Sequence, residues 1–229
     1  MEEYIITFIS DTHSKHKQVT DIGDGNIIIC SGDISSMGYY TELKNFCMWF
    51  SSLDFDHHVF IAGNHDFCFQ DSPGESLEFV NNWGIDYLQD DFLIIGDYND
   101  SVKIWGTPWQ PEFNNWAFNL PRNGQELKEK WDLIPLDTDI LITHGPPFGH
   151  LDKLFSGSNI GCELLRERID IVKPKIHIFG HIHSSYGYKY DSENNIHFIN
   201  ASVLNEQYNF QNKPIRVKWN KNTNSITFL

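Results

Sequence analysis

The stretch HIFGHIHSSYGYKY, residues 177–190, carries an apolar run to a glycine and then places His181 and His183 one residue apart. A short apolar run bounded by glycine is typical of a buried strand. Histidines are common metal ligands and acid–base groups, so two of them directly after a strand indicate a site at the edge of a sheet. The same arrangement recurs along the rest of the chain.

Polar side chains follow four other apolar runs, which lie at residues 4–10, 26–32, 57–63 and 139–145. The polar residues at the ends of these runs are Asp11, His13, Asp33, Asn64, His65, Asp66 and His144. In open α/β sheets, ligands bind beyond the carboxyl ends of the strands. The sequence therefore predicts that these side chains and the two opening histidines contribute to one shared site.

The order of the predicted elements indicates the fold class. Apolar residues recur at helical spacing in residues 39–53, 75–83, 124–134 and 161–172. Further strands are expected at 92–96, 102–106, 175–181, 195–201, 215–219 and 225–229, with a polar turn between the first two. Alternating strands and helices followed by more strands predict layered α/β architecture with mixed sheets. A length of 229 residues predicts a single domain, residues 1–229.

The amino-acid composition argues against nucleic acids and membranes as partners. Lys and Arg total 17 against 31 Asp and Glu, a formal net charge of −14, which argues against a nucleic-acid polymer as substrate. No apolar run approaches the roughly 20 residues of a membrane-spanning helix, and the acidic N-terminus is unlike a signal peptide. The cysteines form no CxxC pair, so we expect reduced thiols and a cytoplasmic protein. The sequence sets no expectation for the oligomeric state.

The residue types at the strand ends suit a particular metal chemistry. Aspartate, asparagine and histidine ligands without cysteine favour Mn, Fe or Zn over a thiolate site. Residues at i and i+2 of an extended segment point to the same side, so Asp11 and His13 can reach one ion, while His181 and His183 can reach two. Each motif alone is weak, but their joint occurrence at successive strand ends indicates two metals joined by a bridging carboxylate.

The series DTH, GD, GNHD, THGPP and GHIH resembles the calcineurin-like metallophosphoesterase superfamily, in particular the metallophosphoesterase-domain proteins related to class III cyclic-nucleotide phosphodiesterases. The resemblance extends over roughly residues 6–202. It implies a β-sandwich of two mixed sheets flanked by helices, an α/β/β/α fold. It also implies two divalent transition metals, with Mn the first choice. The implied first site is Asp11, His13 and His183, the second is Asn64, His144 and His181, and Asp33 is the bridge.

The resemblance also implies a mechanism. A hydroxide between the metals would attack phosphorus, and His65 would donate a proton to the leaving alkoxide. Asp66 has two possible roles, to orient a neighbouring imidazole or to cap the helix that follows it. Complete ligand positions, with histidine at His181 where some relatives have glycine, favour an active enzyme over a non-catalytic nucleotide-binding scaffold.

The expected substrate class depends on arginines that two of the motifs lack. In protein phosphatases of this superfamily, two of the motifs resemble GDxxDRG and RGNHE and include arginines. The corresponding segments of this chain are GDISSMG and AGNHD, without those arginines. The two missing arginines favour a small phosphodiester, first a cyclic nucleotide, over a phosphomonoester, which is the alternative. Lys15, Lys17 and Arg122 could partly compensate for the arginines, but we interpret them as solvated surface charges. The aromatic loop at 105–118 offers Trp109, Phe113 or Trp116 to stack on a base.

Overall fold

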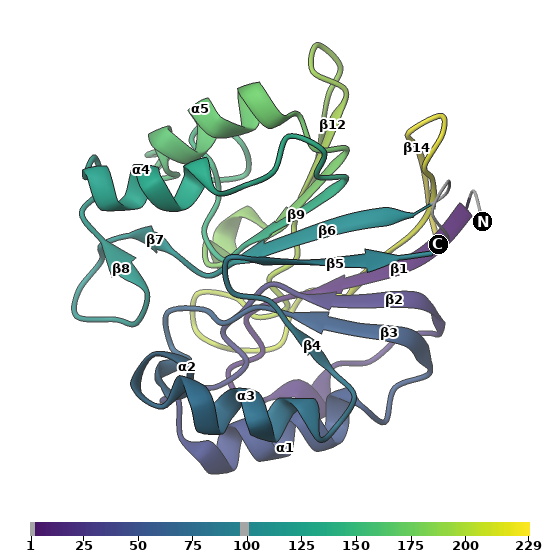
Figure 1. The fold of residues 1–229 in the computed structure, drawn as a ribbon, viewed down its shortest axis with the longest axis vertical. Coiled ribbons are helices and arrows are strands. Elements are labelled where there is room, and N and C mark those ends of the chain that lie inside the picture. Colours follow the sequence, from purple (N-terminus) through teal and green to yellow (C-terminus); the bar gives the residue numbers. More distant parts are fainter. Residues whose placement is uncertain (1–2, 97–100) are drawn as a thin grey trace.

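Alternating burial in the central strands explains why this chain forms stacked layers. In β2 (Gly25–Cys30), Ile27 and Ile29 pack between the two sheets, whereas Ile28 and Cys30 pack toward helices. Successive side chains of a strand point to opposite faces, so a strand that is apolar on both faces must be covered on both. The computed structural model describes residues 3–96 and 101–229 and has helices outside two stacked sheets (Figure 1).

The first sheet has six strands in the order β14-β13-β1-β2-β3-β4. Strands β1 to β4 run parallel to one another, and β13 and β14 add an antiparallel edge next to β1. The bounds of the other five strands are β1 (Glu3–Ile9), β3 (Phe55–Phe60), β4 (Asp86–Tyr87), β13 (Ile215–Asn220) and β14 (Ser225–Phe228).

The second sheet also has six strands, in the order β11-β12-β10-β9-β6-β5. Its four inner strands are parallel, and β11 and β5 form antiparallel edges. The bounds are β5 (Asp91–Ile95), β6 (Val102–Thr107), β9 (Ile140–Thr143), β10 (Ile176–Phe179), β11 (Gly187–Asp191) and β12 (Ile196–Asn200).

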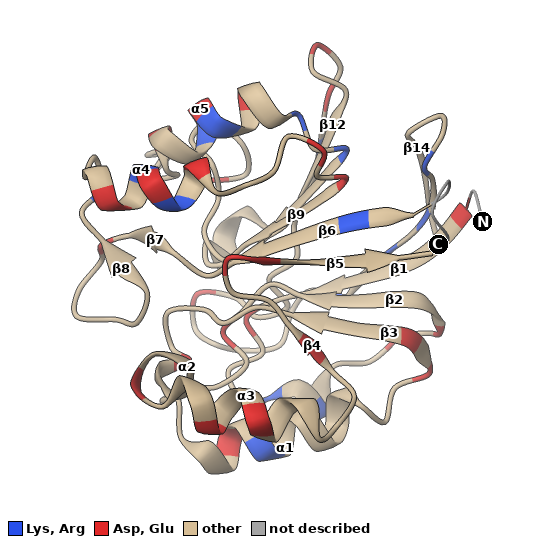
Figure 2. Cartoon of the chain, viewed as in Figure 1, with Lys and Arg blue, Asp and Glu red and all other residues tan. Residues whose placement is uncertain are grey.

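Helices cover the outer face of each sheet through apolar stripes (Figure 1). Below the first sheet lie α1 (Tyr40–Phe50), α2 (Phe67–Asp71) and α3 (Pro73–Asn81), with Phe46 and Phe50 of α1 fully buried. Above the second lie α4 (Gln125–Asp132) and α5 (Glu163–Val172), which bury Trp131 and Ile169. A small pair, β7 (Gln110–Pro111) and β8 (Asn119–Leu120), and two short 3-10 helices, η1 (His16–Gln18) and η2 (His183–Ser185), complete the elements. Asp and Glu residues are distributed over the helices, the loops and several strands (Figure 2).

The two sheets are joined at the edge where their parallel strands end. Ser10, directly after β1, forms a parallel bridge with Ser202, which follows β12 of the other sheet. The Val203 amide also donates to the Ser10 carbonyl at 3.0 Å. This seam brings the loops after β1, β2, β3, β9 and β10 together, and these are the loops that carry the polar motifs.

The α/β class and the pair of mixed sheets flanked by helices are confirmed. The sequence analysis missed β11, which lies inside the opening stretch, because its residues are largely polar. It also missed α2 and the two-residue strands β4, β7 and β8. The polar turn expected between β5 and β6 falls on residues 97–100, outside the described part of the chain. In the described residues, no helix combines the length and apolar character that crossing a membrane requires.

Candidate metal centre

The expected ligands converge into two groups of donor atoms. One group is Asp11, His13 and His183, and the other is Asp33, His144 and His181; within each group the ligand atoms lie within 4.8 Å of one another. Asn64 joins the second group, because its Oδ1 lies 2.9 Å from His144 Nε2. These residues come from five different loops, so the meeting of the two sheets assembles the groups.

Asp33 lies between the two groups. Its Oδ2 is 3.6 Å from His13 Nε2 and 3.4 Å from His144 Nε2. Its Oδ1 accepts a hydrogen bond from the His65 amide at 2.8 Å, which fixes the carboxylate in this position. One carboxylate therefore faces donors of both groups, which is the geometry that a bridging ligand requires.

Backbone strain is concentrated in the same loops. The φ angles of Asp11, His13, Asp33 and His181 are 55°, 40°, 51° and 65°, in the left-handed region that residues other than glycine seldom occupy. Each such residue costs on the order of 1–3 kcal/mol and persists only where the surrounding structure enforces it. The strain aims these side chains inward directly after their strands, a placement that a relaxed extended backbone would not give.

Backbone carbonyls fix the orientation of three of the imidazoles. His144 Nδ1 donates to Ser31 O at 2.9 Å, and His183 Nδ1 donates to Asn205 O at 2.9 Å. His65 Nδ1 donates to the Ser36 carbonyl at 2.8 Å. Each bond leaves Nε2 directed at the centre, which is how metal-binding and acid–base histidines are commonly held.

The donor set fits divalent transition metals. Both ring nitrogens of His13 are buried and have no hydrogen-bond partner among the described residues. A buried imidazole without partners is costly unless a further group satisfies it. Nitrogen and oxygen donors at this spacing, without a thiolate, are the chemistry that Mn, Fe and Zn accept.

Burial and charge pairing set the pKa values of the histidines and carboxyls of the centre. Burial alone would lower the pKa of His144 and of His183, but the Asp33 carboxylate beside His144 and the Asp11 carboxylate beside His183 raise both to about 9. Burial lowers the pKa of His13 and of His181 to about 4, so these two are neutral. Despite burial, the neighbouring imidazolium charges hold the pKa of both carboxyls below the usual range.

His65 lies at the junction of the centre and the aromatic loop. It belongs to a further donor group with His13 and Asp33, and its ring packs on Trp116 with centroids 4.0 Å apart. The ring is thus held by Trp116 on one face and by the Ser36 carbonyl at Nδ1. Trp116, one of the three candidates to stack on substrate, contacts His65, because the Ala117 amide donates to Asn64 O at 3.0 Å and holds the loop against the centre.

Asp66 has neither of the two roles predicted from the sequence. Its carboxylate accepts hydrogen bonds from the amides of Gly63, Ile34 and Ser35 at 2.8–3.2 Å and from Ser35 Oγ at 2.6 Å. Although it precedes α2, its side chain makes no capping bond there. Burial and the Asp33 charge raise the pKa of Asp66 to about 6. Asp66 therefore ties the loop after β2 to the loop after β3 and orients no imidazole directly.

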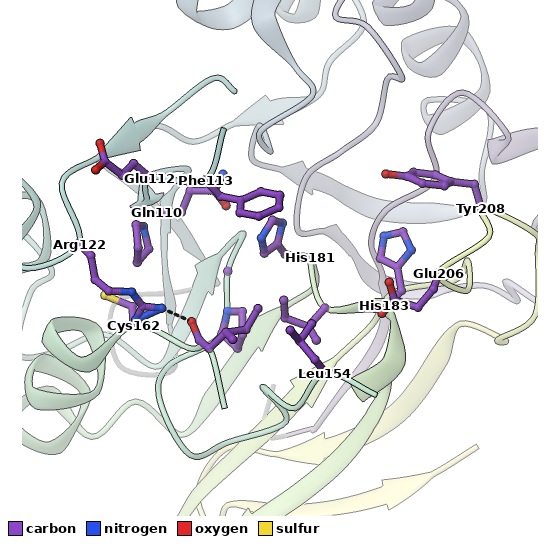
Figure 3. Close-up of a pocket in the computed structure, with 15 residues that line it drawn as sticks. Gln110, Glu112, Phe113, Arg122, Leu154, Cys162, His181, His183, Glu206 and Tyr208 are labelled. Carbon is purple, nitrogen blue, oxygen red and sulfur yellow. Dashed lines mark hydrogen bonds between the residues drawn. The ribbon is translucent and has the colours of Figure 1, made fainter. Parts of the chain in front are cut away.

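A pocket of about 430 Å³ opens beside the centre (Figure 3). His181 and His183 lie on one side, and apolar atoms from Phe113, Leu154 and Ile182 form much of the wall. Phe113 is 59% exposed, so it is available to a ligand. The centre and this pocket are continuous, which allows a bound molecule to contact both.

Two aromatic residues differ from the sequence-based expectation. Trp109 is not presented to the pocket: its Nε1 donates to the Asp90 carboxylate at 2.9 Å, and Lys130 Nζ lies 4.3 Å from its ring centroid. Tyr208, which the sequence analysis missed, lines the pocket and lies 4.8 Å from the His13 ring. Its segment has no strand or helix pattern, and only the folded structure brings it to the centre.

Comparison with known sequences identifies a family. Residues 4–185 match the family described as Calcineurin-like phosphoesterase. The chain is 38% identical over 226 residues to metallophosphoesterase domain-containing protein 1 of Homo sapiens, covering 90% of this chain and 68% of that protein. It is 35% identical over 235 residues to a UPF0046 protein of Caenorhabditis elegans, covering 90% of this chain and 58% of that relative. The chain thus spans little more than half of the worm relative.

A solved structure supports the fold alone. The phosphopantetheinyl hydrolase of Mycobacterium tuberculosis aligns with a TM-score of 0.56 at 14% identity, covering 89% of this chain and 90% of that one. Identity at this level carries the arrangement of sheets and helices but no substrate. The chemistry must therefore be argued from the residues of this chain.

We expect metal affinity to rise with pH between about 6 and 9. A metal takes the neutral imidazole, so the protons that His144 and His183 hold up to a pKa of about 9 compete with it. Calorimetric titration of metal-free protein with Mn²⁺ in buffers of different ionisation enthalpy measures both the affinity and the protons released. A dissociation constant that does not change across this range would contradict the assignment.

We expect Gly180→Ala and Gly63→Ala to lose metal. A Cβ at Gly180 would overlap Asp11 Oδ2, and one at Gly63 would overlap Asp33 Oδ1. The first change should weaken one site and the second should weaken both, as measured by metal content after dialysis. Gly74→Ala is the matched control, because a Cβ there meets nothing within 4 Å. Metal content equal to that of the control in both variants would show that the carboxylates do not bind metal.

Proposed function

The chain belongs to the calcineurin-like phosphoesterase family, a family of metal-dependent phosphoric ester hydrolases, and we propose that it hydrolyses small phosphodiesters such as cyclic nucleotides. The observation that carries the proposal is the continuity of the two donor groups around Asp33 with a pocket whose described lining offers no unpaired lysine or arginine. The first part of this observation supports hydrolysis of a phosphoric ester. The second supports a diester over a monoester.

Two divalent metals are the proposed cofactors, with Mn the first choice. Asp11, His13 and His183 would hold one and Asn64, His144 and His181 the other, with Asp33 bridging both. When bound, such ions supply Lewis acidity and lower the pKa of coordinated water. The folded chain supplies the positions of these ligands in advance, through the strained loops and the carbonyls that orient the imidazoles.

His65 is the proposed general acid. Its protonated ring can keep Nδ1–H on the Ser36 carbonyl and offer Nε2–H to the oxygen that leaves phosphorus. The Trp116 ring restricts the imidazole to this orientation. Proton transfer from a positioned side chain typically contributes about 10²–10⁴-fold to such a step.

Charge in the pocket supports a diester substrate. Among the described residues that line it, Arg122 is the only lysine or arginine, and its guanidinium is bound to Glu163 Oε2 at 2.7 Å and to the Gly161 carbonyl at 2.9 Å. The same lining includes Glu112 and Glu206. Along this wall a dianionic monoester would meet more repulsion from the two carboxylates than a monoanionic diester, because like charges repel and the lining has no unpaired lysine or arginine to offset them.

Aromatic residues at the rim favour a substrate with a planar group. Phe113 and Tyr208 line the pocket and are 59% and 43% exposed. Exposed rings of this kind can stack on a nucleobase without selecting its identity.

The cysteines Cys30, Cys47, Cys68 and Cys162 are buried free thiols, which is in accord with a proposed cytoplasmic location.

We expect bis-p-nitrophenyl phosphate to be hydrolysed with a higher kcat/KM than p-nitrophenyl phosphate by the Mn-loaded protein. The two esters share a leaving group, so their ratio does not report leaving-group chemistry, and charge variants of the pocket separate the charge of the phosphoryl group from the effect of the second aryl ring. The ratio should decrease when Glu112→Gln and Glu206→Gln reduce the negative charge of the pocket. A monoester preferred over all diesters tested would support the phosphatase alternative.

We expect His65→Ala to lose far more activity on a cyclic nucleotide than on bis-p-nitrophenyl phosphate. An alkoxide needs a proton to leave, whereas p-nitrophenolate leaves without one. Steady-state kinetics on both substrates measures the two losses, with metal content determined alongside. His57→Ala is the control, since His57 lies on β3 away from the centre. Equal losses on the two substrates would exclude His65 as the acid.

A further inference from the structure

Gln110 lines the pocket, and its side chain carries a buried hydrogen-bond acceptor that has no partner in the described structure. Its side chain is 2% exposed, and its Oε1 is buried without a hydrogen bond in the described structure. Buried polar atoms are nearly always paired, because an unpaired one gives up its hydration without replacement. An unpaired acceptor on a residue that lines a pocket therefore indicates a place where a ligand donor belongs.

The orientation of the Gln110 amide is fixed by its neighbour. Asn119 Nδ2 donates to the carbonyls of Phe113 and Asn114 at 3.0 and 3.1 Å, so Asn119 must present Oδ1 on its other side. Gln110 Nε2 donates to that Oδ1 at 3.2 Å. Reversing the Gln110 amide would set two oxygens against each other, so Oε1 is the atom left without a partner.

The space next to this oxygen adjoins the proposed metal ligands. A Cβ built on Gly145 would lie 3.8 Å from both Gln110 Cβ and Gln110 Oε1, and would meet no other atom within 4 Å. Gly145 lines the same pocket and directly follows His144, so this space is one residue from the second donor group. A group that fills it would lie next to the proposed metal ligands and not at the far end of a substrate.

We propose that Gln110 Oε1 and the space over Gly145 form a subsite for a hydroxyl group on the carbon next to the scissile ester. The proposal rests on the phosphodiesterase function above and narrows its substrate class. In a 3′,5′-cyclic ribonucleotide this hydroxyl is the 2′-OH. A 2′,3′-cyclic nucleotide has that oxygen esterified and cannot donate.

The chemistry of the oxygen selects a donor. A carboxamide oxygen only accepts hydrogen bonds, so it repels the phosphoryl oxygens and attracts a hydroxyl. A site built to bind a hydroxyl discriminates against the analogue that lacks it, because its own acceptor is then left unpaired. Gln110 is thus a residue that determines specificity, and it is not required for the chemical step itself.

The test compares 3′,5′-cyclic AMP with 2′-deoxy-3′,5′-cyclic AMP. Wild-type Mn-loaded protein should favour the ribonucleotide in kcat/KM by about ten- to a hundredfold. Gln110→Met keeps the length of the side chain and removes the acceptor, so the ratio should fall to near one. Gln18→Met, at an exposed position in η1, should keep the wild-type ratio.

A second variant probes the space without altering Gln110. Gly145→Ala places a methyl group 3.8 Å from Oε1, where it would occupy the position of the hydroxyl. It should reduce the ribonucleotide preference by at least about fivefold and leave the thermal midpoint close to that of wild type. A change in the same ratio in both variants excludes an indirect effect of the lost Gln110–Asn119 bond.

The outcomes separate the subsite from the activity. Suppose that wild type, Gln110→Met and Gly145→Ala all hydrolyse both cyclic nucleotides with the same ratio of kcat/KM. That result would overturn the subsite and would not affect the phosphodiesterase proposal. Absence of turnover on every diester would overturn the activity, and calorimetric binding of 5′-AMP and 2′-deoxy-5′-AMP then decides the subsite. A ribonucleotide preference in binding that Gln110→Met abolishes would support it; equal binding of the two would overturn it.

Discussion

The burial of two aspartate carboxylates at the junction of the sheets is the constraint on which the structure depends. Asp11 and Asp33 are 0% and 2% exposed, and an ion removed from water must be paired and hydrogen-bonded. Ser202 Oγ donates to Asp11 Oδ2 at 2.6 Å, and the His181 amide donates to both of its oxygens at 3.0–3.1 Å. Ser202 and His181 lie in loops that follow β12 and β10 of the second sheet, and Asp11 lies in the loop after β1 of the first, so satisfying the carboxylate also fastens the two sheets together.

The same requirement explains the histidine charges. Without metals, the protonated imidazoles of His144 and His183 provide the positive charge that Asp33 and Asp11 need in a buried place. Bound metals would take over that role and leave the imidazoles neutral. The residues that would hold metal thus also stabilise the metal-free fold, and the strained φ angles of Asp11 and Asp33 are tolerated because the charge pairing enforces them.

Sequence reasoning was successful where local pattern and chemistry coincide. Apolar runs that end in Asp, Asn or His predicted the strands and the convergence of their polar ends, because parallel strands bring their carboxyl ends to one edge. The aromatic loop was less predictable: composition cannot tell that Trp109 is held by Asp90 or that Trp116 packs on His65. Tyr208 follows no pattern at all, and hydrogen bonds such as those from His183 to the Asn205 carbonyl and from the Ser184 amide to Glu206 hold its segment against the centre.

The pocket wall and the metal centre differ in the sign of the charge that they present to a ligand. Positive charge is concentrated at the centre, where the phosphoryl group would react, and comes from the histidines and from the metals that they would bind. The adjoining wall offers acceptors, Gln110 Oε1 and the carboxylates of Glu112 and Glu206, while the guanidinium of Arg122 is neutralised by Glu163. A phosphoryl group is therefore favoured at the centre and disfavoured along the wall, whereas hydroxyl and amino groups have the opposite preference. This polarity would orient an asymmetric ester with its phosphorus at the metals, even though the surface of the protein is acidic.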